Sequence, residues 1–182
     1  MNFDKDTVLK TKRLILRYMR ETDAHDIFVN INSDKDVLKY FIDKYVENET
    51  DMTLSKTIDL CLKSNRYLFA VELNDTREVI GMILQCSSPD SIFNVSEIGF
   101  AIGKAHWNKG YTSEAAAAMI DFLFSSGVHK VTAGYIVGNN ASKRVMEKCG
   151  MLYECRRKEE IFYNGKYNDV EYYYLINDRK QD

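Results

Sequence analysis

The chain has 182 residues, of which 45% are hydrophobic and 29% charged, and its formal net charge is -2. These values are ordinary for one compact globular domain, and we expect residues 1–182 to form it without disulfides or metals. The near-neutral charge argues against a nucleic-acid binder, which usually carries a clear basic excess.

Hydrophobic periodicity and turn residues predict seven strands along the chain. In order they cover residues 13–17, 67–73, 79–86, 96–102, 130–137, 152–163 and 166–176. Helices are expected at 22–30, 33–41, 50–65, 112–126 and 141–149. A hairpin-rich first half followed by two strand–helix crossovers predicts a mixed α/β sheet with helices on both faces.

The sequence predicts neither a targeting signal nor a metal-binding or redox-active set of cysteines. The polar N-terminal segment lacks the apolar stretch of a signal peptide, and no apolar run approaches the roughly 20 residues that span a bilayer. The four cysteines show no C-x-x-C spacing, so neither a zinc site nor a redox pair is expected. The sequence therefore predicts a cytoplasmic protein with free thiols and no membrane partner.

A short polar loop joins the fourth predicted strand to an alanine-rich helix. It reads Trp107-Asn-Lys-Gly110, and the helix follows at Thr112. The N-terminus of a helix offers free N–H groups and the positive end of a dipole, which together bind phosphate groups. The loop therefore predicts a phosphate or pyrophosphate site, although an ordinary strand–turn–helix connection also fits. Neither a Walker loop nor a Rossmann fingerprint is present.

A second segment, Asn139-Asn-Ala-Ser142, follows the fifth strand and opens the next helix. By itself it fits helix capping. Together, the two segments resemble the two acetyl-CoA motifs of the GNAT N-acetyltransferases. Residues 107–115 nearly reproduce W-G-K-G-Y-[AM]-[ST]-E-A of the ribosomal-protein acetyltransferase branch, and residues 139–151 fit N-x-x-S-x-R-V-x-E-K-x-G-[FM]. Residues 11–17 also match that branch's first strand, T-x-R-L-x-L-R.

This resemblance implies a GNAT fold whose fourth and fifth strands are splayed, with the pantetheine arm of acetyl-CoA in the gap. It implies an N-acetyltransferase in which a primary amine, from a protein N-terminus or a small molecule, attacks the thioester directly. The cofactor-binding residues that it assigns are Phe100, Ala101, Ile102, Asn108, Lys109, Gly110, Tyr111, Thr112, Ser113, Asn139 and Ser142. No metal is expected, and relatives are monomers or homodimers.

Two catalytic residues are candidates within this family pattern. Glu97 is the candidate general base, although it also fits a surface strand position, and Glu72 is the second choice. Ser142 is the candidate proton donor to the leaving thiolate, or a helix-capping residue only. Many GNAT enzymes use a tyrosine for that step where this chain has Met146, and Asn108 and Thr112 also depart from the pattern. A non-catalytic acetyl-CoA-binding module is the alternative function.

Five tyrosines gather in the last predicted hairpin, at positions 163, 167 and 172–174. They fit an aromatic cage for a cation. Alternation between core and surface positions along a strand pair explains them more simply.

Overall fold

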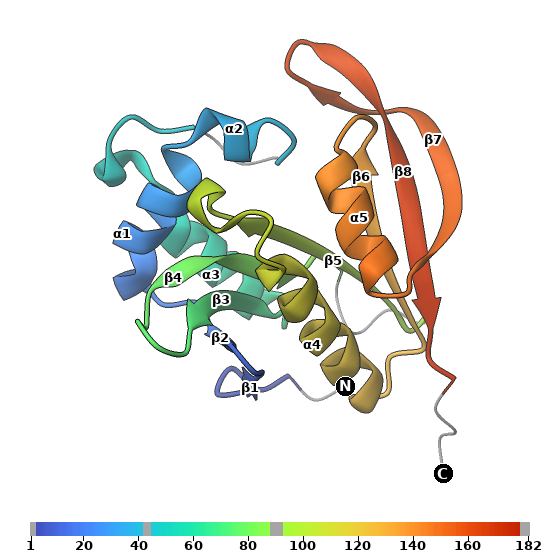
Figure 1. The fold of residues 1–182 in the computed structure, drawn as a ribbon, viewed down its shortest axis with the longest axis horizontal. Helices are drawn as coiled ribbons and strands as arrows, with labels where there is room; N and C mark the ends of the chain where they lie inside the picture. The colour runs from blue at the N-terminus through green and yellow to red at the C-terminus, as the bar shows by residue number, and fades with distance from the viewer. Residues whose placement is uncertain (1–2, 42–44, 88–92, 179–182) are drawn as a thin grey trace.

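The computed structural model describes residues 3–41, 45–87 and 93–178 (Figure 1). Its centre is a mixed sheet in the order β1-β2-β3-β4-β5-β6-β8-β7. The strands are β1 (Val8–Lys10), β2 (Leu14–Tyr18), β3 (Leu68–Leu73), β4 (Val79–Gln85), β5 (Val95–Ile102), β6 (Lys130–Ile136), β7 (Leu152–Tyr163) and β8 (Lys166–Ile176). The α-helices are α1 (Ala24–Ile27), α2 (Lys35–Leu38), α3 (Leu54–Lys63), α4 (Tyr111–Ser125) and α5 (Asn140–Lys148).

The mixed α/β sheet and its seven predicted strands are confirmed, and an eighth strand, β1, precedes them. This strand is only three residues long and pairs with β2, with Leu9 opposite Leu16. Its side chains are exposed or half-buried, so it lacks the alternation by which longer strands are found in a sequence.

The helices before β3 differ in extent and type from those predicted. The first expected helix, 22–30, is split into α1 and a π-helical turn at Phe28–Asn32. The next helix starts afresh because the Asp34 side chain accepts hydrogen bonds from the N–H groups of Asp36 and Val37. Such an N-cap favours a new helix over continuation of the previous one. The third helix begins at Leu54 rather than near residue 50.

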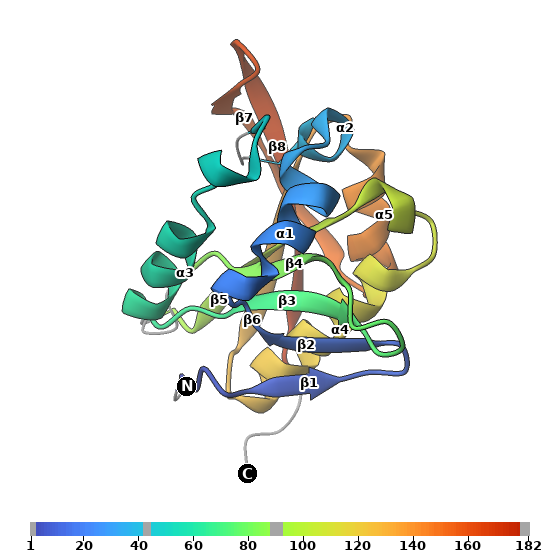
Figure 2. The same ribbon diagram turned by 90° about the vertical axis from the view of Figure 1, so that its left-hand side faces the viewer.

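Helices cover both faces of the sheet, as predicted, and Figure 2 shows α1 and α3 on one side and α5 on the other. On the first face Ile27, Ile31 and Ile58 pack against strand residues such as Leu68 and Met82. On the second face α4 buries an apolar stripe against the sheet that consists of Ala115, Ala116, Met119, Ile120 and Leu123. The second face holds the larger core.

The parallel pair β5–β6 is incomplete. Its register runs only from Val95 opposite Lys130 to Glu97 opposite Thr132. Both strands continue for several residues beyond this point without pairing with each other, while β5 stays paired with β4 and β6 with β8. The splay predicted between these two strands is therefore confirmed, and Glu97 lies at the point where they separate.

Gly81 marks a close approach between β4 and β5. A Cβ atom at this position would lie 2.2 Å from the carbonyl oxygen of Ala101, which the backbone cannot accommodate without moving. We expect Gly81→Ala to lower the free energy of unfolding by about 2 kcal/mol, measured by urea denaturation. Gly99→Ala is the matched control, because its Cβ would meet only side-chain atoms, at 3.2 Å. Equal losses in the two variants would contradict this explanation.

Candidate active site

The β5–α4 loop, residues 103–110, places a helix N-terminus beside the splay. Asn108 (φ 61°) and Gly110 (φ 82°) both adopt left-handed backbone conformations. Asparagine is one of the few non-glycine residues that adopt this region readily, so Asn108 fits where related motifs have glycine. Gly110 is the N-cap of α4 and offers no side chain to cap it. The N–H groups of the first turn therefore remain available to an anion.

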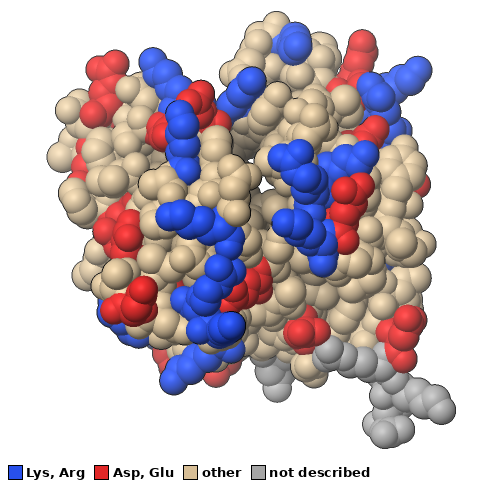
Figure 3. Space-filling view, viewed as in Figure 1, with Lys and Arg blue, Asp and Glu red and all other residues tan. Residues whose placement is uncertain are grey.

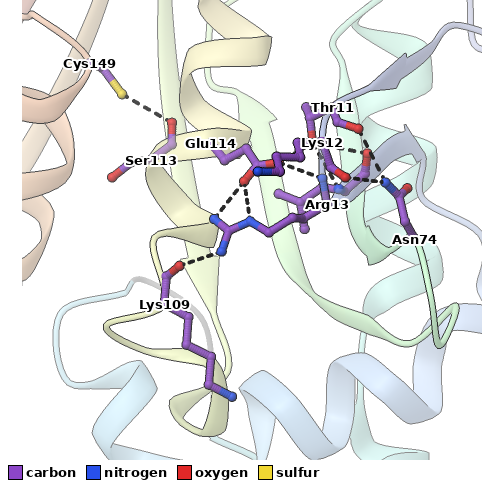
Figure 4. Close-up of polar contacts among 9 residues, drawn as sticks. Thr11, Lys12, Arg13, Asn74, Lys109, Ser113, Glu114 and Cys149 are labelled. Atoms are coloured by element: carbon purple, nitrogen blue, oxygen red, sulfur yellow. Dashed lines mark hydrogen bonds and ion pairs between the residues drawn. The ribbon is translucent and has the colours of Figure 1, made fainter.

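Two contacts hold this loop in place. At its start the indole Nε1 of Trp107 donates a hydrogen bond to the carbonyl oxygen of Ile102, over 2.7 Å. At its end the Arg13 guanidinium donates from Nη1 to the carbonyl oxygen of Lys109 (2.9 Å) and pairs with Glu114 (Figure 4). The sequence interpretation assigned no site role to Arg13 or Glu114, although both lie within segments that match the family pattern.

The predicted cap at the start of α5 is present. The Asn139 Oδ1 atom accepts from the N–H group of Ser142 (3.2 Å), and Asn139 Nδ2 donates to Ser142 Oγ (2.9 Å). Because Ser142 Oγ accepts in this pair, its own proton is left to donate elsewhere. The α5 helix lies beside the start of α4, where Cys149 Sγ contacts the carbonyl oxygen of Ser113 at 3.6 Å.

The β5 edge beyond Glu97 exposes backbone groups to the splay. The carbonyl group of Glu97 and the N–H group of Gly103 both hydrogen-bond toward β4, over 2.7 and 2.9 Å. Backbone groups alternate in direction along a strand, so those of Ile98, Phe100 and Ile102 point toward the gap. Since Trp107 already occupies the Ile102 carbonyl, Phe100 has the N–H and carbonyl groups best placed to pair with an extended ligand.

Basic side chains flank this region. Figure 3 shows lysine and arginine side chains over the β5–α4 loop and over α5, on either side of a narrow hollow. The loop contributes Lys104 and Lys109, and α5 contributes Lys143, Arg144 and Lys148. Lys104 pairs with Asp36, whereas no ion pair within the described residues engages Lys109 or Arg144. The field at the hollow therefore favours an anionic ligand.

Glu97 lies on the opposite face of the sheet, at the vertex of the splay. Its side chain is on the same side of β5 as Ala101, which belongs to the core beneath α1–α3. The pKa of the half-buried Glu97 carboxyl is raised above its ordinary value by burial, against a smaller lowering by the positive charge of Arg157 and a further rise from Glu160. The pKa of the Tyr172 phenol is also raised, by burial and by the charge of Glu97.

The tyrosines of the β7–β8 hairpin alternate between the two faces, as the simpler interpretation predicted. Tyr173 is buried in the core beneath α4, while the ring of Tyr172 lies over Gly134 on the other face. A Cβ atom at Gly134 would be 2.9 Å from that ring. The guanidinium of Arg157 lies 4.5 Å from the Tyr172 ring centroid, so the cation on this aromatic surface belongs to the protein itself.

The second-choice base lies elsewhere. Glu72, on β3, is buried and contacts the guanidinium groups of Arg17 (2.6 Å) and Arg77 (2.8 Å). Both carboxylate oxygens of Glu72 are thus held in ion pairs. His106 is in the β5–α4 loop, with its Nε2 atom 3.3 Å from Glu78 Oε1.

Neither a metal centre nor a membrane span is found in the part of the chain that the structure describes. Its His, Cys, Asp and Glu side chains form no group of three or more that could hold a metal ion. Among the same residues, every helix is too short or too polar to cross a bilayer.

A splayed mixed sheet with an uncapped helix N-terminus beside the gap is the arrangement that the motif resemblance led us to expect. A family model described as "Acetyltransferase (GNAT) domain" matches residues 13–152. The chain belongs to this family and is an acetyl-CoA-dependent N-acetyltransferase.

Relatives and solved structures agree with this family. An uncharacterized N-acetyltransferase of Bacillus subtilis (strain 168), YoaA, is 27% identical over 175 residues, which cover 95% of this chain and 98% of that protein. A crystal structure of a GNAT-family acetyltransferase from Bacillus anthracis has a TM-score of 0.81 at 28% identity, covering 95% of this chain and all of that one. The spermidine N-acetyltransferase of Vibrio cholerae, solved with CoA and spermine, has a TM-score of 0.78 at 24% identity, covering 92% and 97% of the two chains. At that identity it shows a shared fold alone.

Proposed function

We propose that residues 1–182 act as one catalytic domain that transfers the acetyl group of acetyl-CoA to a primary amine in a ternary complex. The observation that carries this proposal is the incomplete β5–β6 pair, which is flanked by the uncapped N-terminus of α4 and by the Asn139–Ser142 cap of α5. Groups on both faces of the sheet would reach a thioester arm that lies in this gap.

The cofactor's phosphates and its pantetheine arm have separate binding groups in this proposal. The pyrophosphate binds the N–H groups of residues 108–113, and the positive charge of Lys109 attracts it further. The pantetheine arm pairs with the free edge of β5 at Phe100, in place of a strand. Asn139 holds the arm from the β6 side, where its cap already fixes the orientation of its amide.

Acetyl transfer requires a base, an oxyanion donor and a proton for the thiolate. Glu97 is the base that accepts the amine proton directly or through water, and a carboxyl of raised pKa is better matched to that task. A backbone N–H of β5 at the splay stabilises the charge that develops on the thioester oxygen. The Ser142 hydroxyl donates to the leaving thiolate, because Met146 has no proton to give and is buried.

The acceptor amine enters from the face of α1–α3, above Gly134 and beside Tyr172. Its class stays open between a protein N-terminus and a small amine. Spermidine acetylation by the Vibrio cholerae relative makes polyamines the first small amines to try. The alternative function, a module that binds acetyl-CoA without catalysis, predicts binding but no turnover of any amine.

The test is acetyl-CoA-dependent thiol release against a panel of amines. The panel contains peptides with different N-terminal residues, polyamines, aminoglycosides and amino acids. We expect turnover of one class and, for Ser142→Ala, a kcat lowered about tenfold with the acetyl-CoA KM little changed, as expected when a transition-state interaction is lost. Binding of acetyl-CoA without any turnover across the panel would favour the non-catalytic module, and an unchanged kcat in Ser142→Ala would remove its proposed role.

A further inference from the structure

The first turn of α4 is connected to the β1–β2 turn by a dense set of polar contacts (Figure 4). Glu114 accepts hydrogen bonds from the Thr11 hydroxyl (2.6 Å), the Arg13 N–H group (2.9 Å) and Arg13 Nε (2.7 Å). The Arg13 guanidinium also lies 4.4 Å from the centroid of the Tyr111 ring. Arg13 therefore contacts the β5–α4 loop, the first residue of α4 and the first-turn carboxylate at once.

This arrangement affects the phosphate-binding amides in two ways. Through the Lys109 carbonyl (2.9 Å), Arg13 fixes the peptide that precedes Gly110. Through Glu114 it holds a carboxylate away from the free N–H groups of the helix, where an acidic side chain would otherwise bind or repel an incoming anion. The pKa of Glu114 is lowered by its bonds to Thr11 and Arg13 in spite of burial, so the carboxylate stays ionised and paired.

The β1–β2 turn is itself anchored. The Asn74 side chain, in the β3–β4 turn, donates to the carbonyl oxygens of Thr11 and Lys12, both at 3.3 Å. The Asn74 N–H group donates to the Arg13 carbonyl oxygen at 3.0 Å. Arg13 thus projects from a braced turn rather than from a free surface, and its guanidinium is positioned before any ligand arrives.

We propose that Arg13 is a positioning residue for acetyl-CoA. It acts through Lys109 and Glu114 to preorganise the phosphate-binding amides of the β5–α4 loop. This inference rests on the proposed cofactor site. Because Arg13 is already engaged by protein groups, its removal should weaken the binding of the phosphate-bearing part of the cofactor and leave the chemical step intact.

The experiment compares acetyl-CoA with S-acetylpantetheine, which carries the same thioester without the nucleotide phosphates. For Arg13→Gln we expect the acetyl-CoA Kd, measured by calorimetry, and the acetyl-CoA KM to rise about tenfold or more. The kcat at saturation and the S-acetylpantetheine KM should stay unchanged. Arg13→Lys should recover part of the loss, since lysine restores the charge but not the fork of donors. Lys12→Gln, in the same turn, is the control and should bind acetyl-CoA like the wild type.

Repeating the substitution in a Glu114→Gln background tests the route of the effect. If Arg13 acts through Glu114, Arg13→Gln should raise the acetyl-CoA Kd less in the Glu114→Gln background than in the wild type. The reason is that the effects of substituting two residues of one hydrogen-bonded network do not add. A full-sized effect would remove Glu114 from the route and would overturn that part of the proposal, leaving only the contact of Arg13 with the Lys109 carbonyl. An unchanged acetyl-CoA Kd in Arg13→Gln, or an equal loss for S-acetylpantetheine, would also overturn it. A wild type that bound no acetyl-CoA would overturn the proposed function as well, which separates the two failures.

Discussion

Replacing Glu97 by glutamine should lower kcat about a hundredfold or more, because the variant loses the group that accepts the amine proton. The size of the side chain and its place at the vertex of the splay are retained, so acetyl-CoA affinity should change little. The pH profile gives a sharper test. A base works deprotonated, so kcat/KM should fall as the pH is lowered. Because burial raises the pKa of Glu97, this fall on the acid side of the profile (the acid limb) should occur at pH values above the ordinary pKa range of glutamate. In Glu97→Gln the acid limb should disappear.

Glu160→Gln is the matched variant for that profile. The negative charge of Glu160 contributes to the raised pKa of Glu97, and its carboxylate also pairs with Arg157 at 3.0 Å. Removing it lowers the pKa of Glu97, so the acid limb should move to lower pH while kcat on the plateau is retained. An acid limb that persists in Glu97→Gln, or that stays fixed in Glu160→Gln, would assign the base to another group.

Replacing Gly110 by valine should weaken acetyl-CoA binding about tenfold to a hundredfold. A β-branched residue rarely adopts a φ near 82°, so the loop would shift to relieve strain of about 1–3 kcal/mol. That shift would turn the first N–H groups of α4 away from the cofactor phosphates. Calorimetry with acetyl-CoA measures the loss directly.

Gly127→Val provides the control for Gly110→Val. Gly127 follows the other end of α4, has a φ of 88°, and has open space around a would-be Cβ. The two substitutions should therefore cost comparable stability in urea denaturation, yet only the Gly110 variant should lose affinity for acetyl-CoA. Equal affinities in the two variants would contradict the assignment of the phosphate site to the β5–α4 loop.

The longer elements were predictable because their signals are local, whereas the splay was expected only from the resemblance of the two motifs to the GNAT family. Strands such as 152–163 show clear turn boundaries, and the two motifs at 107–115 and 139–151 fall on the elements expected of them. Asn139 caps its helix as its position suggested. These features depend on residues close together in the chain, where spacing and side-chain type carry the information.

The missed features depend on contacts between distant segments. Arg13 and Glu114 are about a hundred residues apart, and nothing in either segment alone indicates their pairing. The same is true of Tyr163, at the end of β7, whose hydroxyl donates to the carbonyl oxygen of Phe41 at 3.0 Å and so joins the last hairpin to the segment after α2. The burial that raises the pKa of Glu97 likewise arises only when β4, β5 and the β7–β8 hairpin come together.

The most direct test of the proposed cofactor site is amide hydrogen exchange with and without acetyl-CoA. Binding at the splay predicts slower exchange in residues 100–113 and 139–142, with no change in the β3–β4 turn at residues 74–78. Slower exchange confined to other segments, or no change anywhere at saturating acetyl-CoA, would contradict the account of this site.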